Sequence, residues 1–420
     1  MRNKFFKSFI LVIAIAIITV GFGNTQVSYG EDSITGETFN TNSNGVVVLD
    51  AKNNTVLYNK EGDTKFYPAS CTKILTAIIA IEKGKMDQVL TVSDNAVHNI
   101  DKESSHIALD VGEQITLEDA LYGMLLASGN DCAVVVAEAI SGSVEKFSEE
   151  MNKKAKEIGC TNSHFSNPHG LWEENHYTTP KDLALILSYC VKNKDFLKIS
   201  STLKYTVPAT NKTGERELWN NHRMLENKAC YYEPVVCGKS GYVTKSKFNL
   251  VTYGKSNGME LITATMESDD PVRLCDDTKL LMGRYFDNYI SKTINPRNTG
   301  ITQISVSGKK VPIKTKTDLE LLIPKDSTIS DISYNAQSYQ KDFPIEEGTA
   351  VGKVVATCNG KIVGSCEVYA AKKIPTTKGM VLRISLISVA ALAVLTLIIF
   401  VVVKITGKAR RRRFERDMED

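Results

Sequence analysis

The chain has 420 residues, which is enough for two or three domains. Its 51 Lys and Arg residues against 48 Asp and Glu residues give a formal net charge of +3, which is too small to indicate a nucleic acid as partner. Nine cysteines, an odd number at irregular spacings, do not form the pattern of a disulfide scaffold. Many of them sit in apolar sequence contexts, where a free cysteine behaves as a small hydrophobic residue. This cysteine usage indicates a poorly oxidising environment.

The first 30 residues have the three regions of a secretory signal peptide. A basic start, Met1-Arg-Asn-Lys4, precedes an apolar run over residues 9–22 and the small residues that end at Gly30. The sequence therefore predicts a mature chain that begins near Glu31. A retained signal anchor is the alternative, because Gly30 is a mediocre cleavage residue and the apolar run is not short.

The carboxyl-terminal region predicts attachment to a membrane. Residues 384–403 contain no charge, and a stretch of about 20 such residues can cross a bilayer as a helix. The tail over residues 404–420 is rich in Arg and Lys, so the positive-inside rule places it in the cytoplasm. We expect a single-pass protein of the cytoplasmic membrane, with a transmembrane helix over residues 380–403 and the larger part of the chain outside the cell.

The first half of the intervening chain begins with a predicted β-hairpin over residues 45–59 and then turns helical. A helix is predicted from Pro68 to Gly84. The next, over residues 115–127, carries a capping box from Thr116 to Asp119. Further helices are predicted over residues 131–140 and 144–158 and from Pro180 onward.

Strand patterns return after residue 230. Runs over residues 234–243, 248–253 and 259–266 predict three strands, and a helix over residues 271–290 follows. Strands at both ends with helices between them indicate an α+β domain over residues 31–292, in which the two ends complete one antiparallel sheet.

A linker by composition, residues 295–300, leads to alternating patterns that predict a small all-β domain over residues 301–371. Its clearest hairpin turns at Asn359-Gly360. This turn pairs Cys358 with Lys361, and strict alternation then puts Cys366 on the opposite face from Cys358. These two cysteines are therefore not expected to bond within the hairpin.

Ser70-Cys71-Thr72-Lys73 is the first of three short motifs that carry chemistry. A spacing of three residues puts Ser70 and Lys73 on one face of a helix, at an amino-terminal turn that favours negative charge. Lys73 can serve as base to a nucleophilic Ser70 only if burial or another cation, such as Lys239, lowers its pKa. Alone, the pattern is also that of an ordinary helix start.

The second motif, Ser128-Gly-Asn130, falls in a tight connection between two predicted helices, and the third, Lys239-Ser-Gly241, lies in a predicted strand of the closing sheet. Each is weak by itself. In this order and in these contexts, the three motifs resemble those of active-site-serine penicillin-recognising enzymes.

The chain is similar, more narrowly, to low-molecular-mass penicillin-binding proteins, which are serine-type D-alanyl-D-alanine carboxypeptidases with a β-lactamase/transpeptidase-like fold. Further matching stretches are Pro68–Thr76, Ser128–Asp131, Asn167–Leu171 and His176–Thr179. The chain departs from the pattern at Ser240, where threonine is usual, and at Cys71, where methionine is frequent. A spanning helix also replaces the amphipathic anchor of several relatives.

The resemblance implies a role for each residue of the motifs. Ser70 would attack the bond between two terminal D-alanines, Lys73 would take its proton, and Ser128 would relay that proton to the leaving amine. Substrate-binding residues would be Asn130, Lys239, Ser240, Gly241 and Tyr242, with the backbone N–H groups of Ser70 and Tyr242 holding the oxyanion. No cofactor or metal is implied. The expected partners are peptidoglycan stem peptides ending in D-Ala-D-Ala and β-lactam antibiotics.

Other interpretations have less support in the residues. A β-lactamase shares the three motifs, but Glu173 and Glu174 lack the spacing to an asparagine that a water-activating loop of that class shows. Cys71 could replace Ser70 as nucleophile, although one residue along a helix turns a side chain about 100° away. The remaining alternatives are a metal site at the histidines 164, 169 and 176, a catalytically inactive wall-binding protein, and use of the decoy triplet at residues 212–214, a polar turn without flanking strands.

Overall fold

The computed structural model describes residues 38–226, 229–339 and 341–376, and scattered residues between 389 and 407. The predicted signal peptide lies outside the described residues, as do most of the predicted transmembrane helix and basic tail. Among the residues that are described, no helix has the length and apolar character needed to cross a membrane.

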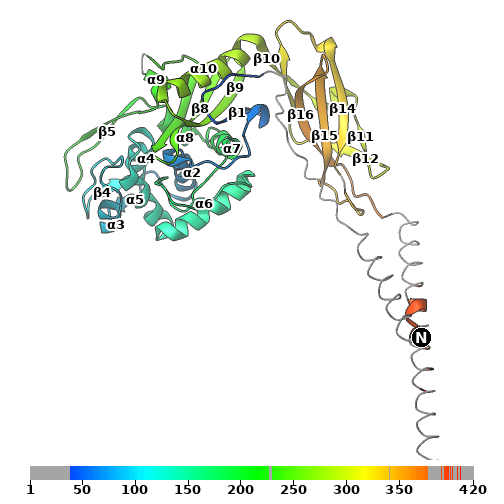
Figure 1. Ribbon diagram of the computed structural model, residues 1–420, viewed down its shortest axis with the longest axis horizontal. Helices are drawn as coiled ribbons and strands as arrows, with labels where there is room; N and C mark the ends of the chain where they lie inside the picture. Colours follow the sequence, from blue (N-terminus) through cyan, green and yellow to red (C-terminus); the bar gives the residue numbers. More distant parts are fainter. Residues whose placement is uncertain are drawn as a thin grey trace, which may run out of the picture. The chain divides into compact units, whose positions relative to one another are not determined.

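A five-stranded antiparallel sheet organises the first domain, with strand order β2-β1-β9-β8-β7 (Figure 1). The amino-terminal hairpin closes onto strands from much later in the chain, since Gly45 of β1 pairs with Met266 of β9. This arrangement is the one predicted from the sequence, and it leaves β7 at an edge. The strands are β1 Gly45–Asp50, β2 Thr55–Lys60, β7 Val235–Val243, β8 Lys247–Ser256 and β9 Met259–Ser268.

Both faces of this sheet are buried, which explains why β1 reads as an uninterrupted apolar run. Val46 and Val48 pack into an apolar cluster with residues of α10, Pro271–Asn288. Val47 and Leu49 point the other way, into the core of a helical lobe. Figure 1 shows α10 on one side of the sheet and the lobe on the other.

Several helices of the lobe begin at side-chain caps that can be recognised in the sequence. Thr116 accepts from the Asp119 backbone N–H at the start of α4, and Thr179 caps α7 ahead of Pro180. The predicted helix over residues 131–140 is α5, which starts one residue earlier. The helices are α2 Lys73–Lys83, α3 Asp94–His98, α4 Leu117–Leu126, α5 Asn130–Ser141, α6 Val144–Ile158, α7 Pro180–Cys190, α8 Lys194–Ser201 and α9 Arg223–Glu226.

Two small antiparallel pairs complete the lobe, and the sequence patterns did not predict them. They are β3 Val89–Thr91 with β4 Gln114–Thr116, and β5 Lys204–Val207 with β6 Arg216–Trp219.

The second domain is built from strands, as predicted. A five-stranded sheet has the order β11-β12-β16-β15-β14, and β10 pairs separately with β13. Because α10 ends at Asn288 and β10 follows at once, the predicted helix over residues 271–290 is slightly too long, and β10 was missed. The elements are β10 Tyr289–Ile294, η2 Pro296–Thr299, β11 Gln303–Val306, β12 Lys309–Lys314, β13 Leu319–Pro324, η3 Ile329–Asp331, β14 Ile332–Ser338, β15 Ala350–Cys358 and β16 Lys361–Ala370.

One detail of the β15–β16 hairpin differs from the prediction. Cys358 pairs with Lys361 as expected, but the register shifts beyond the turn and leaves Val363 as an extra residue in β16. This β-bulge reverses the alternation. Cys366, opposite Val354, therefore faces the same apolar core as Cys358, so the prediction of opposite faces is wrong. Both thiols are free.

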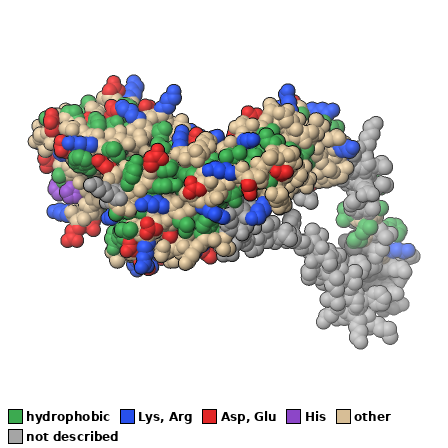
Figure 2. All heavy atoms as spheres, turned by 90° about the horizontal axis from the view of Figure 1, so that it is seen from above, with side chains coloured by type: hydrophobic (Ala, Val, Ile, Leu, Met, Phe, Trp, Pro, Cys, Tyr) green, Lys and Arg blue, Asp and Glu red, His purple; other side chains and the backbone are tan. Residues whose placement is uncertain are grey.

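Surface charges of both signs are interspersed. On the face shown in Figure 2, Lys and Arg side chains lie among Asp and Glu side chains, with hydrophobic side chains between them. The small net charge of the chain is therefore not the difference between two large patches of opposite sign on that face.

Candidate active site

Ser70 lies where the helical lobe meets the sheet. Its turn is η1, a 3₁₀ helix over Ala69–Thr72 that leads directly into α2, whereas the sequence predicted one continuous helix. The local reason is that Ala69 has a φ of 48°, outside the right-handed helical region. The Cys71 thiol donates to the Lys239 carbonyl at 3.3 Å and so joins this turn to β7.

Lys73 is fully buried, and its Nζ has three neighbours. These are Asn130 Oδ1 at 2.6 Å, the His169 carbonyl oxygen at 2.8 Å and Ser70 Oγ at 2.9 Å. The first two can only accept hydrogen bonds. They therefore take the two protons of a neutral amine, which leaves the lone pair of Lys73 facing the Ser70 hydroxyl. This is the geometry of a base beside a nucleophile.

Two buried lysines sit near each other without behaving alike. The pKa of Lys73 lies well below its usual value, because burial and then the positive charge of Lys239 disfavour an ammonium there. Burial also lowers the pKa of Lys239, to about 8. The surroundings of Lys73 therefore favour its neutral amine, while Lys239 remains mostly charged at neutral pH.

The connection between α4 and α5 presents Ser128 and Asn130. Ser128 is buried and has a φ of 65°, a left-handed conformation that costs a non-glycine residue about 1–2 kcal/mol and persists only where the surroundings hold it. Asn130 accepts from Lys73 through Oδ1 and donates from Nδ2 to Ser104 Oγ at 2.8 Å. With both ends engaged, the orientation of the Asn130 amide is fixed.

Strand β7 supplies the opposite wall. A Cβ on Gly241 would lie 2.8 Å from the backbone nitrogen of Ser70, so glycine is what lets β7 approach the turn of the nucleophile. In the part of the chain that the structure describes, no strand pairs with the outer edge of β7, which leaves its backbone open to a peptide. Lys239 is buried and donates to the Ser240 carbonyl at 2.9 Å.

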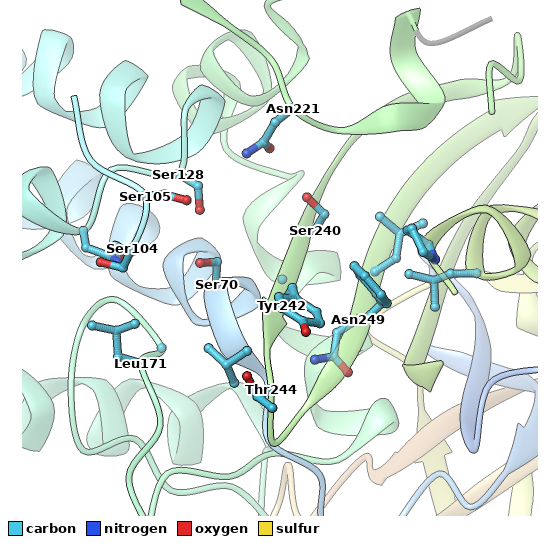
Figure 3. A pocket seen from close by; sticks show the side chains of 18 of the residues that line it. Ser70, Ser104, Ser105, Ser128, Leu171, Asn221, Ser240, Tyr242, Thr244 and Asn249 are labelled. Atoms are coloured by element: carbon cyan, nitrogen blue, oxygen red, sulfur yellow. The ribbon is translucent and has the colours of Figure 1, made fainter. Parts of the chain in front are cut away.

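These walls enclose a cavity of about 610 Å³. Figure 3 shows Ser70, Ser128 and Ser240 around the same space, with Tyr242 and Thr244 further along β7. Of the predicted site residues, Lys73 and Lys239 lie behind this surface, and the others form it. The residues that line the cavity are Ser70, Asp101, Glu103, Ser104, Ser105, Ser128, Asn130, Gly170, Leu171, Asn221, Arg223, Ser240, Gly241, Tyr242, Val243, Thr244, Phe248, Asn249, Leu250, Pro271, Leu274 and Cys275.

Two contacts of the site were missed by sequence reasoning. Ser104, which fixes the Asn130 amide, lies in a polar loop without any distinguishing pattern. The His169 carbonyl acts through the main chain, and a main-chain acceptor leaves no trace in residue identity. The loop that carries it is held by Asn167, whose Oδ1 accepts from Gly170 N at 2.7 Å. The resemblance of Asn167–Leu171 to the family is the only signal in the sequence for this loop.

The alternative nucleophile and the histidines are engaged elsewhere. Cys71 is buried, which raises the pKa of its thiol to about 12, and its Sγ points to β7 rather than to Lys73. His176 Nε2 lies 2.8 Å from Thr72 Oγ1, and its Nδ1 accepts from the Ser166 backbone. Because Nδ1 accepts, Nε2 carries the proton and donates to Thr72.

The decoy triplet over residues 212–214 does not reach the cavity, in agreement with its rejection. It does connect two strands, β5 and β6, which corrects the expectation that no strands flank it. Asn211 Oδ1 accepts from the Gln114 backbone at 2.7 Å, and a bidentate pair joins Arg216 to the buried Glu113. The turn therefore packs against the segment that precedes α4.

The fold and the site, in which a serine hydroxyl lies 2.9 Å from a buried lysine amine, are those of a class of serine-type hydrolases. Comparison with known proteins narrows this class. A family model described as D-alanyl-D-alanine carboxypeptidase matches residues 32–270, and the C-terminal domain of penicillin-binding protein 5 matches residues 289–376. The chain belongs to the D-alanyl-D-alanine carboxypeptidase family and is a serine-type hydrolase of the low-molecular-mass penicillin-binding group.

Individual relatives cover most of the chain. The D-alanyl-D-alanine carboxypeptidase DacF of Bacillus subtilis is 30% identical over 77% of this chain and 84% of its own length. The D-alanyl-D-alanine carboxypeptidase DacA of Haemophilus influenzae is 28% identical over 87% of this chain and 91% of its own length. The crystal structure of penicillin-binding protein 5 from Haemophilus influenzae matches 81% of this chain and 99% of its own with a TM-score of 0.66 at 26% identity. Nothing in these comparisons favours a β-lactamase.

Proposed function

We propose that Ser70 is the nucleophile with which this carboxypeptidase removes the terminal D-alanine from peptidoglycan stem peptides. The observation that carries the proposal is the position of Lys73. Its Nζ lies 2.9 Å from Ser70 Oγ, and its other two neighbours are pure acceptors. Burial and the charge of Lys239 lower the pKa of Lys73, which favours the neutral amine that can take the serine proton.

Acylation follows from this pair. Ser70 Oγ attacks the carbonyl carbon of the penultimate D-alanine while its proton passes to Lys73. Negative charge then develops on the carbonyl oxygen between the backbone N–H groups of Ser70 and Tyr242. The close approach of Gly241 to the Ser70 nitrogen supports this arrangement. Ser128, held in the cavity wall, relays the proton to the amine of the departing D-alanine.

Selection of a free carboxyl terminus is assigned to β7. Lys239 keeps most of its charge at neutral pH and donates to the Ser240 carbonyl, and Ser240 itself lines the cavity. A cation beside a hydroxyl suits a carboxylate. The fixed amide of Asn130 faces the substrate from the other wall. Water then hydrolyses the ester on Ser70, whereas a penicillin, whose strained amide acylates the same atom, leaves a bulky product that blocks water.

The test is the variant Ser70→Ala, with Cys71→Ala as its matched control. We expect Ser70→Ala to lose both D-alanine release from diacetyl-L-Lys-D-Ala-D-Ala and covalent labelling by a fluorescent penicillin, while Cys71→Ala keeps both. Labelling that survives in Ser70→Ala but disappears in Cys71→Ala would overturn the assignment.

We also propose that the enzyme works on the outer side of the cytoplasmic membrane. The support is in the sequence: a leader-like segment over residues 1–30, an uncharged run over residues 384–403 and a basic tail after it. The domains would then be residues 31–292 and 301–371, followed by the anchor. Trypsin added to intact protoplasts should remove both domains and leave the basic tail protected. Protection of the whole chain would contradict this orientation.

A further inference from the structure

The position of the edge strand β7, taken together with the proposed function, determines in which direction a bound substrate peptide runs along the strand. The terminal carboxylate lies toward Lys239, and the scissile carbonyl lies at Ser70 and Tyr242. The part of the substrate that precedes the scissile bond must then continue along β7 past Tyr242, toward Thr244. A peptide in this position runs antiparallel to β7, in the manner of an added strand.

This end of the cavity is bordered by two segments from different parts of the chain. Leu171, on the loop after His169, and Thr244, in the turn after β7, both line it, and Figure 3 shows them at the same end. The residue that follows each of them completes a rim. Lys245 Nζ lies 6.0 Å from the ring centroid of Trp172, within the range of a cation–π contact.

The indole of Trp172 is supported but not covered. Its ring meets the ring of Tyr67 edge-on at 6.3 Å, and the residue is still 48% exposed. An exposed aromatic ring held by a second ring offers a firm apolar surface at little cost in conformational entropy. Such a surface beside a substrate channel suits the carbon chain of an extended peptide.

Lys245 is a cation without an anionic partner among the described residues. Lys247, two residues further along, differs from Lys245 because it forms an ion pair: Lys247 Nζ lies 2.9 Å from Asp269 Oδ1. The acidic residue next to Trp172, Glu173, accepts from Asn167 Nδ2 at 2.7 Å. A positive charge therefore lies beside an exposed aromatic face, on the two residues that directly follow the cavity-lining Leu171 and Thr244.

We propose that Trp172 and Lys245 form a subsite for a carboxylate carried by the substrate on the amino side of the scissile bond; this inference rests on the proposed function. Lys245 lies two residues beyond the end of β7, in the turn that leads to β8. A peptide laid along β7 from the scissile bond at Tyr242 therefore reaches the vicinity of Lys245 after about two residues, or roughly 7 Å of its own extended chain. The carboxylate that reaches it belongs about two residues before the penultimate D-alanine. The substrate class is a D-Ala-D-Ala peptide with a free acidic group at that position.

The experiment compares two peptides, acetyl-γ-D-Glu-L-Lys-D-Ala-D-Ala and the same peptide with the α-carboxylate of D-Glu converted to an amide. Because exposed charge pairs are weak, we expect the wild type to prefer the acid by about two- to five-fold in kcat/KM at low salt. The preference should disappear in Lys245→Gln and shrink in the wild type at about 0.5 M NaCl. Lys247→Gln is the matched control and should keep it.

Acylation of Ser70 by benzylpenicillin, whose side chain carries no carboxylate on the acyl side, should be unchanged in Lys245→Gln. Equal turnover of the two peptides by the wild type, or a preference that persists in Lys245→Gln, would overturn the subsite and leave the proposed function intact. No D-alanine release from either peptide would overturn both.

Discussion

The contact between β7 and the turn of the nucleophile can be tested by adding one methyl group. In Gly241→Ala, the new Cβ would lie 2.8 Å from both Pro68 O and Ser70 N and 3.0 Å from Cys71 N. Ordinary van der Waals contact begins at 3.4 Å. All three neighbours are backbone atoms, so no flexible side-chain end can move aside. The strand and the turn must separate by about half an ångström instead.

Such a separation should damage catalysis more than folding. Overpacking of this kind typically costs about 1–3 kcal/mol of stability. The same displacement acts on the two N–H groups proposed to hold the oxyanion, where loss of one donor costs roughly 10²–10³ in rate. A partial displacement should therefore reduce acylation by about 10- to 100-fold in a folded protein.

The assay is the second-order rate of acylation by a fluorescent penicillin, measured together with the thermal midpoint. Gly214→Ala is the matched control, because a Cβ there meets nothing within 4 Å; its acylation rate should equal that of the wild type. If Gly241→Ala acylated as fast as the wild type, β7 would not hold the oxyanion where we place it. A loss of rate that is matched by loss of the folded fraction would count against the argument as well.

Three further predictions concern the base, the anion site and the anchor. Lys73→Arg should show no measurable acylation at any pH, because a guanidinium does not give up its proton; measurable acylation would remove Lys73 from its role. The value of kcat/KM for a D-Ala-D-Ala peptide should fall as pH rises through about 8, where Lys239 loses its proton, whereas acylation by a neutral penicillin ester should not fall, since it lacks a carboxylate and neutral Lys73 becomes no scarcer. In Lys239→Gln, the pKa of Lys73 should rise because one neighbouring charge is gone, so the ester profile should move to higher pH; an unshifted profile would show that burial or another group, not Lys239, lowers the pKa of the base. Residues 31–372 alone should form a soluble, active enzyme, and loss of turnover with an intact circular dichroism spectrum would show that the anchor is not separable.

The sequence predicted the sheet and the three motifs because each depends on local patterns. The three motifs meet because β1 pairs with β9 and so completes one sheet that packs against the helical lobe. The apolar runs of these two strands predict that both faces of the sheet are buried. The capping box at Thr116 and the helix start at Pro180 follow from short-range chemistry, whereas the antiparallel closure of β1 on β9 was predicted from the order of strand and helix patterns along the chain.

Features that depend on distant packing could not be predicted. The 3₁₀ turn at Ser70 follows from the backbone conformation of Ala69. The Ala69 carbonyl packs so closely on Gly170 that a Cβ at position 170 would collide with it. The bulge at Val363 shifts a register that strict alternation would have continued. Ser104 and the His169 carbonyl reach Asn130 and Lys73 from loops whose composition resembles that of many surface loops. In each of these cases, tertiary contact rather than residue type decides the geometry.

The surroundings of Lys73 fit both of its protonation states. As a neutral amine, it donates to Asn130 Oδ1 and the His169 carbonyl and receives the Ser70 proton on its lone pair. As an ammonium, it would have three protons for the same three oxygen atoms, one of them now the Ser70 Oγ that is bonded to the tetrahedral carbon of the substrate. The proton can therefore arrive and leave without a rearrangement of the side chain. Because Asn130 is itself fixed by Ser104, the acceptors stay in place as well. Preorganisation of this kind means that the cost of orienting the base is met during folding, before a substrate binds.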